Sequence, residues 1–60
     1  MVDDRDVFKA AAGLTKNFGD DAEFECSQIA EKWEARGHLD AARLWRRVLS
    51  AIEELRKLPN

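Results

Sequence analysis

Few side chains in this 60-residue chain have the chemistry for catalysis. Cys26 is the only cysteine and His38 the only histidine, so a nucleophile and its base would have to be this pair. Cys26 lies on an apolar helical stripe and His38 in a predicted loop, which places them apart. We therefore interpret Cys26 as a small buried hydrophobic residue. Because no nucleophile elbow, phosphate-binding loop or acid–base pair is visible either, we expect neither enzymatic activity nor a cofactor.

A run of carboxylates at residues 20–25 is a second candidate, as a site for a hard cation. A calcium-binding loop needs about a dozen residues, with oxygen ligands at alternating positions and a central glycine. This segment has neither feature, and its carboxylates suit the positive end of a helix that starts here. One histidine and one cysteine also exclude a zinc cluster, so we predict no metal site.

Three arginines in the last third of the chain, Arg43, Arg46 and Arg47, could form a basic face. On a recognition helix, such arginines contact the edges of guanine bases. The net charge of −2 argues against nucleic acid as a partner, and so do Glu53 and Glu54 one or two turns further on. A nucleic-acid-binding regulator is therefore the alternative function.

The charges of this segment can also pair with each other along the helix surface. Asp40 precedes Arg43 by three residues, and Glu53 precedes Arg56 and Lys57 by three and four. Side chains at these spacings are neighbours on a helix. The favoured interpretation is thus a solvated face with ion pairs inside the helix.

Two glycine–aspartate breaks divide the chain into three helical stretches. Gly19 and Gly37 each follow an amphipathic run, where a glycine ends a helix in a left-handed conformation. Helices are predicted at about residues 4–18, 21–36 and 40–58, with short loops at these two glycines.

The predicted helices begin at acidic residues, whose side chains accept hydrogen bonds from the free amides of the first turn. The candidate caps, in chain order, are Asp3 or Asp4, Asp20 or Asp21, and Asp40. With Asp20 as the cap, Glu23 completes a variant of the capping box. The third helix is expected to stop at Pro59, which cannot continue it.

The short connections predict that consecutive helices run roughly antiparallel. We expect an all-α fold with residues 1–60 as a single domain, a small three-helix bundle. The alternative is a flatter arrangement, in which the second and third helices form a hairpin and the first lies across it. A chain of this length buries only ~60% of its unfolded surface, so self-association is one way to gain stability.

The third helix has an apolar arc that is wider than one neighbouring helix would cover. Exposed apolar surface of this kind marks interaction sites. The interface candidates are Leu44, Val48, Ala51, Leu55 and Leu58. The core candidates are Leu14, Phe18, Ile29, Trp33, Trp45 and Ile52. We therefore predict a protein-interaction module, either a homodimer or an accessory subunit, with no small-molecule substrate.

The sequence also bears on the cellular location. The first residues are acidic and lack the apolar segment of a signal peptide. No apolar run approaches the ~20 residues that cross a bilayer. Together with a single free cysteine, these features predict a cytoplasmic protein without a membrane partner.

The segments at residues 18–22, 45–48 and 51–55 read FGDDA, WRRV and AIEEL, with Gly37 after the first of them. In this pattern the chain resembles a group of short proteins of alphaproteobacteria whose function is unknown. The resemblance covers nearly the whole chain and implies a helical, cytoplasmic bacterial protein without catalytic residues. His38 departs from the pattern, because members of the group have an acidic residue after the second glycine.

The last two predicted helices are also similar to one tetratricopeptide unit, a helical hairpin with glycine in its turn. Gly37, Ala41 and Trp45 carry this similarity. Because a single unit cannot bury its own face, the first helix or a second copy of the chain would have to cover it.

Overall fold

The structure, a computed structural model, describes residues 3–58. Its elements are α1 (Asp4–Phe18), the short 3₁₀ helix η1 (Gly19–Asp21), α2 (Ala22–Ala35) and α3 (Leu39–Lys57). Within residues 3–58 there is no strand, so the predicted all-α class is confirmed. The expected stop at Pro59 lies outside the described residues.

The start of α1 follows from one side chain. Asp3 has extended backbone angles, and its carboxylate accepts a hydrogen bond of 3.4 Å from the amide of Arg5. An aspartate in this position supplies a partner for an amide that has none inside the helix. Asp4 and Asp6 add negative charge to the first turn, which suits the positive end of the helix. The predicted cap is confirmed.

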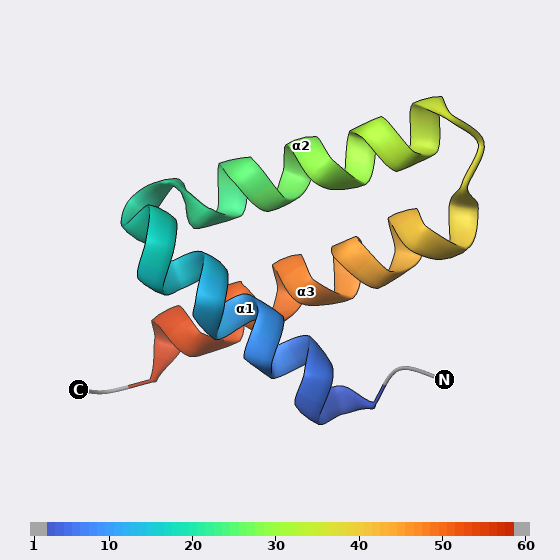
Figure 1. Cartoon of the computed structure of the whole chain (residues 1–60). Coiled ribbons are helices and arrows are strands. Elements are labelled where there is room, and N and C mark those ends of the chain that lie inside the picture. The colour runs from blue at the N-terminus through green and yellow to red at the C-terminus, as the bar shows by residue number, and fades with distance from the viewer. Residues whose placement is uncertain (1–2, 59–60) are drawn as a thin grey trace.

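The first break is a bend and not a loop. Helical turns continue through η1 from α1 into α2, so residues 4–35 form one long bent helical stretch that α3 follows (Figure 1). Gly19 has φ +56° and ψ −123°. The positive φ was predicted and is what glycine adopts cheaply, but ψ lies far from the left-handed helical value. Gly19 therefore turns the chain where a left-handed helix end and a short loop were expected.

The second break is a Schellman turn. The amide of Gly37 donates to the carbonyl of Glu34 at 3.0 Å, and the amide of His38 donates to that of Trp33 at 2.9 Å. Gly37 has φ +79°, which confirms the predicted helix end. The α3 helix then begins at Leu39, with Asp40 in its first turn and not as its cap.

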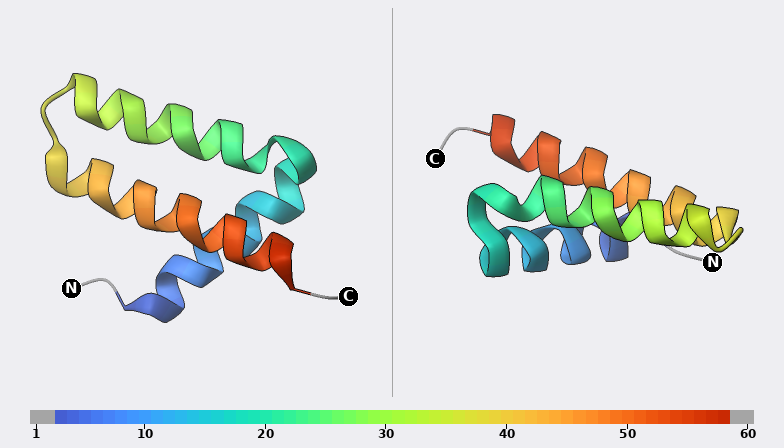
Figure 2. Two further views of the ribbon diagram at one scale, coloured as in Figure 1. Left: turned by 180° about the vertical axis from the view of Figure 1, so that it is seen from behind. Right: turned by 90° about the horizontal axis from the view of Figure 1, so that it is seen from above.

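The three α-helices are arranged as a hairpin with one helix across it. The α2 and α3 helices run antiparallel, and α1 crosses α3 obliquely on one side of the hairpin (Figures 1 and 2). The molecule is flat, with extents of 38 × 24 × 16 Å. This arrangement is the alternative that the sequence left open, and not the bundle of antiparallel neighbours that was the first choice.

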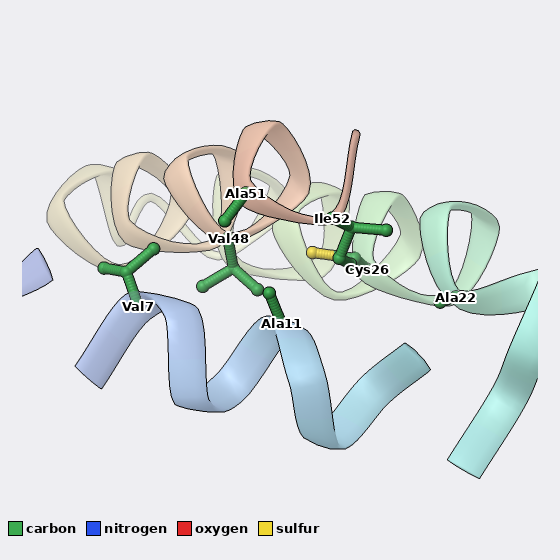
Figure 3. Packing of buried hydrophobic residues seen from close by; sticks show 7 residues of the cluster. All are labelled: Val7, Ala11, Ala22, Cys26, Val48, Ala51 and Ile52. Atoms are coloured by element: carbon green, nitrogen blue, oxygen red, sulfur yellow. The ribbon is translucent and has the colours of Figure 1, made fainter. Parts of the chain in front are cut away.

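The core lies where the three helices meet and consists of small side chains. Its buried members are Val7, Ala11, Ala22, Cys26, Val48, Ala51 and Ile52 (Figure 3). Ala11 and Ala22 are fully buried, and residues this small let helix backbones approach closely. Ile52, Val48 and Cys26 are the largest side chains that are fully buried.

The predicted core is correct in its centre and wrong at one end. Ile52 is fully buried, as predicted. Four further candidates are partly buried, namely Leu14, Ile29, Trp33 and Trp45. Phe18 was expected in the core but is 45% exposed. It is the last residue of α1, directly before the bend at Gly19.

Candidate functional site

The middle of the predicted interface on α3 is covered by α1. Val48 and Ala51 are 2% and 4% exposed, and they pack against Val7 and Ala11 of α1 (Figure 3). Their assignment as interface residues is therefore corrected, because the crossing helix buries the middle of this face within the chain itself. Of the remaining candidates, Leu44 and Leu55 are partly buried against the core, and Leu58 is 62% exposed.

Five large apolar side chains remain exposed to solvent in the described chain. They are Phe8, Phe18, Phe24, Leu39 and Leu58. An exposed residue standing alone needs no function, whereas a group of them beside a hollow points to a partner. Phe8 is an exposed ring that lines hollows formed jointly by α1 and α3.

The surface around Phe8 is an apolar hollow between α1 and α3. Its volume is ≈ 470 Å³, and its lining residues are Asp4, Arg5, Phe8, Lys9, Ala12 and Leu55. Phe8 and Ala12 lie one turn apart on the exposed side of α1, and Leu55 belongs to the edge of the core on α3. We call Phe8, Ala12 and Leu55 the Phe8 patch. Of the predicted interface residues, Leu55 belongs to this patch, and Leu58 follows it by three residues.

A second hollow also has Phe8 in its lining. Its volume is ≈ 280 Å³, and its lining residues are Asp4, Val7, Phe8, Arg47, Ser50, Ala51 and Glu54. Val7 lines this hollow and Lys9 the first, and on a helix these two residues lie about 100° from Phe8 in opposite directions, so the hollows flank its ring. Lys9 lines the first hollow and Glu54 the second. Both side chains are exposed, and neither takes part in an ion pair among residues 3–58. The ring of Phe8 thus stands between two unpaired charges of opposite sign.

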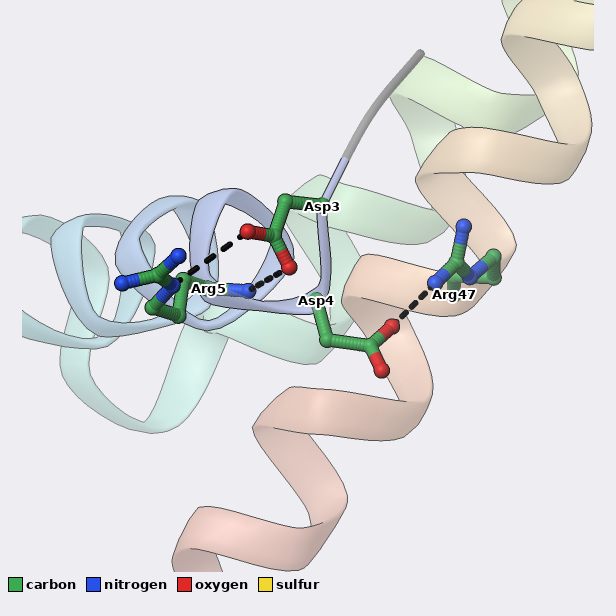
Figure 4. Close-up of polar contacts among 4 residues, drawn as sticks. All are labelled: Asp3, Asp4, Arg5 and Arg47. Carbon is green, nitrogen blue, oxygen red and sulfur yellow. Dashed lines mark hydrogen bonds and ion pairs between the residues drawn. The ribbon is translucent and has the colours of Figure 1, made fainter.

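The arginines predicted to contact nucleic acid are mostly engaged within the chain. Arg46 binds Glu34 of α2 at 2.7 Å, and Arg47 binds Asp4 of α1 (Figure 4). Arg43 has no ion-pair partner in the part of the chain that the structure describes. The pair of Asp40 and Arg43 that the spacing suggested does not form there. Two of the three arginines therefore join helices and do not form a free basic face.

Arg56 of α3 contacts residues at the first bend and at the start of α2. Its Nε lies 2.8 Å from Oε1 of Glu23, and its guanidinium also lies 3.7 Å from Asp20 and 3.4 Å from the carbonyl oxygen of Gly19. The predicted capping box of Asp20 and Glu23 is therefore wrong, since α2 has no side-chain cap and both carboxylates face Arg56. The pairs of Glu53 with Arg56 and Lys57 are likewise absent among the described residues, because Arg56 points to α2.

Cys26 is a protonated core residue. Its side chain is fully buried, and its thiol donates a hydrogen bond of 3.2 Å to the carbonyl of Trp45. Burial raises the pKa of the thiol, and the positive charge of Arg46 opposes this shift only in part. His38 contacts Trp33 edge-on, with ring centroids 5.4 Å apart. Cys26 and His38 were predicted to lie apart, and in the structure each contacts another residue. A thiol whose pKa is raised is not activated as a nucleophile.

Other kinds of site find no support in residues 3–58. No three side chains of histidine, cysteine, aspartate or glutamate come together there in a way that could hold a metal ion. None of the helices in this range combines the length and the apolar character that crossing a membrane requires. No protein-family model, curated protein or solved structure matches the chain.

Phe8 was not among the residues predicted from the sequence to form the core or an interface. A signal was nevertheless present in the sequence. Val7 and Ala11 form an apolar stripe at helical spacing, and Phe8 and Ala12 each follow one of these residues by one position. Residues one position apart on a helix point about 100° away from each other. When the stripe is buried, this second pair has to lie at the rim of the contact.

Proposed function

We propose that this chain is a small cytoplasmic protein-interaction module without enzymatic activity. The observation that carries the proposal is Phe8, which is 45% exposed and lies beside a hollow shared with Ala12 and Leu55. Aromatic side chains at such positions supply much of the binding energy of protein interfaces. In contrast to the prediction from the sequence, the contact surface lies on both α1 and α3, because the middle of the α3 face is already covered.

The proposal is tested by removing the ring of Phe8. We expect that Phe8→Ala abolishes whatever association the purified native protein shows, with itself or with another protein. Phe24→Ala is the matched control, because Phe24 is also exposed, at 62%, but lines neither hollow. Sedimentation velocity and recovery of bound proteins from the native source measure the outcome. If Phe8→Ala keeps every association of the native chain, the proposal fails.

Nucleic-acid binding is the second candidate. A hollow of ≈ 500 Å³ on α3 has Arg43, Arg46 and Arg47 in its lining, together with Glu34, Leu39 and Ala42. The candidate is weaker, because Arg46 and Arg47 already have carboxylate partners. Titration with mixed-sequence duplex DNA at ~50 mM salt is the test, since electrostatic binding is strongest at low salt and falls steeply as salt is added. No binding under these conditions removes this candidate.

We also propose that the chain belongs with the short alphaproteobacterial proteins that it resembles. What supports this is the position of the shared residues: Gly19 and Gly37 make the two turns, and Trp45 and Ile52 pack at the centre of α3. The hairpin of α2 and α3 with glycine in its turn likewise supports the similarity to one tetratricopeptide unit. Fractionation of cells that produce the protein tests its location in the cytoplasm.

A further inference from the structure

We infer that the partner at the Phe8 patch is a second copy of this chain, related to the first by a two-fold axis. The inference rests on the proposed function and names its partner. Lys9 and Glu54, which carry opposite charges, lie in the two hollows on opposite sides of Phe8. A surface with this arrangement is complementary to itself.

Two-fold symmetry explains why the surface around Phe8 is complementary to a second copy of itself. A two-fold axis places each point of the surface against the point on the opposite side of the axis in the other copy. With the axis close to Phe8, Lys9 of each copy therefore faces Glu54 of the other, which gives two equivalent ion pairs. Because the axis passes close to Phe8, the same operation brings the exposed rings of Phe8 of the two copies against each other.

The other charges near the patch do not oppose this pairing. Asp4 forms an ion pair with Arg47, and Arg5 with Asp3 (Figure 4). Lys9 and Glu54 are thus the charges around Phe8 that remain without a partner in residues 3–58. Like charges facing each other across an interface would cost several kcal/mol, and the two-fold arrangement avoids this.

The size of the chain limits the strength of the dimer. A stable interface buries about 800 Å² on each partner, which is roughly a sixth of the accessible surface of 4649 Å². The patch is centred on one aromatic residue and has a charged rim. We therefore expect a reversible dimer with a dissociation constant of roughly 1–100 μM.

Exchange of the two charges tests the geometry. In Lys9→Glu and in Glu54→Lys alone, two like-charged pairs replace the attractive ones, and we expect each variant to dimerise at least tenfold more weakly. Mixing the two variants restores attractive pairs in a heterodimer, and the double variant in one chain restores them in a homodimer. Sedimentation velocity at ~10–300 μM spans the expected range of affinity. Lys32→Glu is the control, because Lys32 is exposed on α2 and lines neither hollow.

The outcomes separate this inference from the proposed function. A native chain that stays monomeric at 300 μM, about the top of this range, or charge variants that are not rescued by mixing, overturn the second copy as the partner. If Phe8→Ala then still removes a different bound protein, the interaction module stands and only its partner was wrong. If Phe8→Ala changes no association at all, both proposals fail. Circular dichroism of each variant shows that the helices are intact in every comparison.

Discussion

Arg56 near the end of α3 binds Glu23 in the first turn of α2, with 2.8 Å between Nε and Oε1. The same guanidinium reaches the carbonyl oxygen of Gly19, at the bend between α1 and α2. One side chain of α3 therefore contacts the bend and the start of the following helix together. Because the direction in which α1 leaves the bend decides where it crosses α3, this contact helps to set the geometry of the Phe8 patch.

The contribution of this ion pair can be measured with a double-mutant cycle of Arg56→Gln and Glu23→Gln. Both side chains are about two-fifths exposed, at 40% and 39%, so solvent screens the pair. We expect a coupling free energy of about 0.2–1 kcal/mol from urea unfolding, decreasing in ~1 M NaCl. The pair of Asp3 and Arg5 is the control. Its side chains are 53% and 88% exposed, so its coupling is expected to be smaller. Equal coupling in low and high salt contradicts an electrostatic contact.

Substitution by alanine is expected to change the free energy of unfolding in opposite directions at two glycines. Gly37 has φ +79°, so a side chain there is strained, and we expect Gly37→Ala to lower the free energy of unfolding by about 1–2 kcal/mol. Gly13 lies inside α1, and a methyl group there meets no atom within 4 Å. We expect Gly13→Ala to raise the free energy of unfolding by about 1 kcal/mol, because alanine is the better helix former. Thermal and urea unfolding measure both changes, and a loss of stability in Gly13→Ala contradicts the second.

The thiol of Cys26 should make stability depend on pH in the alkaline range. Burial raises its pKa in the folded chain above the ordinary value of 9.0. Well below pH 9.0 the thiol is protonated in both the folded and the unfolded chain, so it does not make the free energy of unfolding depend on pH. As pH rises further, the unfolded chain loses this proton first, so the free energy of unfolding falls until the raised pKa of the folded chain is reached.

The expected slope from this one group is at most about 1.4 kcal/mol per pH unit. The comparison is with Cys26→Ala, which is less stable at neutral pH but lacks the titrating thiol. Urea unfolding of both proteins between pH 7 and about pH 11 should show the difference between them shrinking as pH rises above the ordinary thiol pKa. Parallel curves over this whole range would mean that burial does not shift the pKa.

The core should be sensitive to the loss of a single methyl group. Ile52 is fully buried, and we expect Ile52→Val to cost about 0.5–1.5 kcal/mol. Leu58, 62% exposed, provides the comparison, with a change within about 0.5 kcal/mol for Leu58→Ala. Chemical unfolding at low protein concentration keeps self-association out of the measurement. A larger effect at Leu58 than at Ile52 would place the centre of the core elsewhere.

Local sequence signals predicted the local structure well. Asp3 caps α1 and Gly37 makes the second turn because each depends on a few neighbouring backbone groups. The capping box at Asp20 and Glu23 failed for a reason that lies far along the chain. Both carboxylates have Arg56 as a competing partner, and only the fold brings it close.

Only part of the candidate site could be predicted from the sequence. Periodicity showed that Val48 and Ala51 belong to a wide apolar face, but not that α1 crosses it and buries both. The crossing depends on the angle of the bend at Gly19, which no residue pattern encodes. Leu55, one of the interface candidates, lines the hollow beside Phe8, whereas Phe8 acquires its position only from the crossing.

The hairpin with one helix across it also sets the order in which the chain folds and opens. Contacts between α2 and α3 join residues that are close along the chain through the turn at Gly37, and such local contacts form early and fast. The contact of Asp4 with Arg47 closes a much longer loop, so α1 is expected to dock last. The helix that docks last is also the one that detaches most readily in the folded state. Amides of α1 should therefore exchange with solvent sooner than those of the hairpin, and each detachment briefly uncovers Val48 and Ala51.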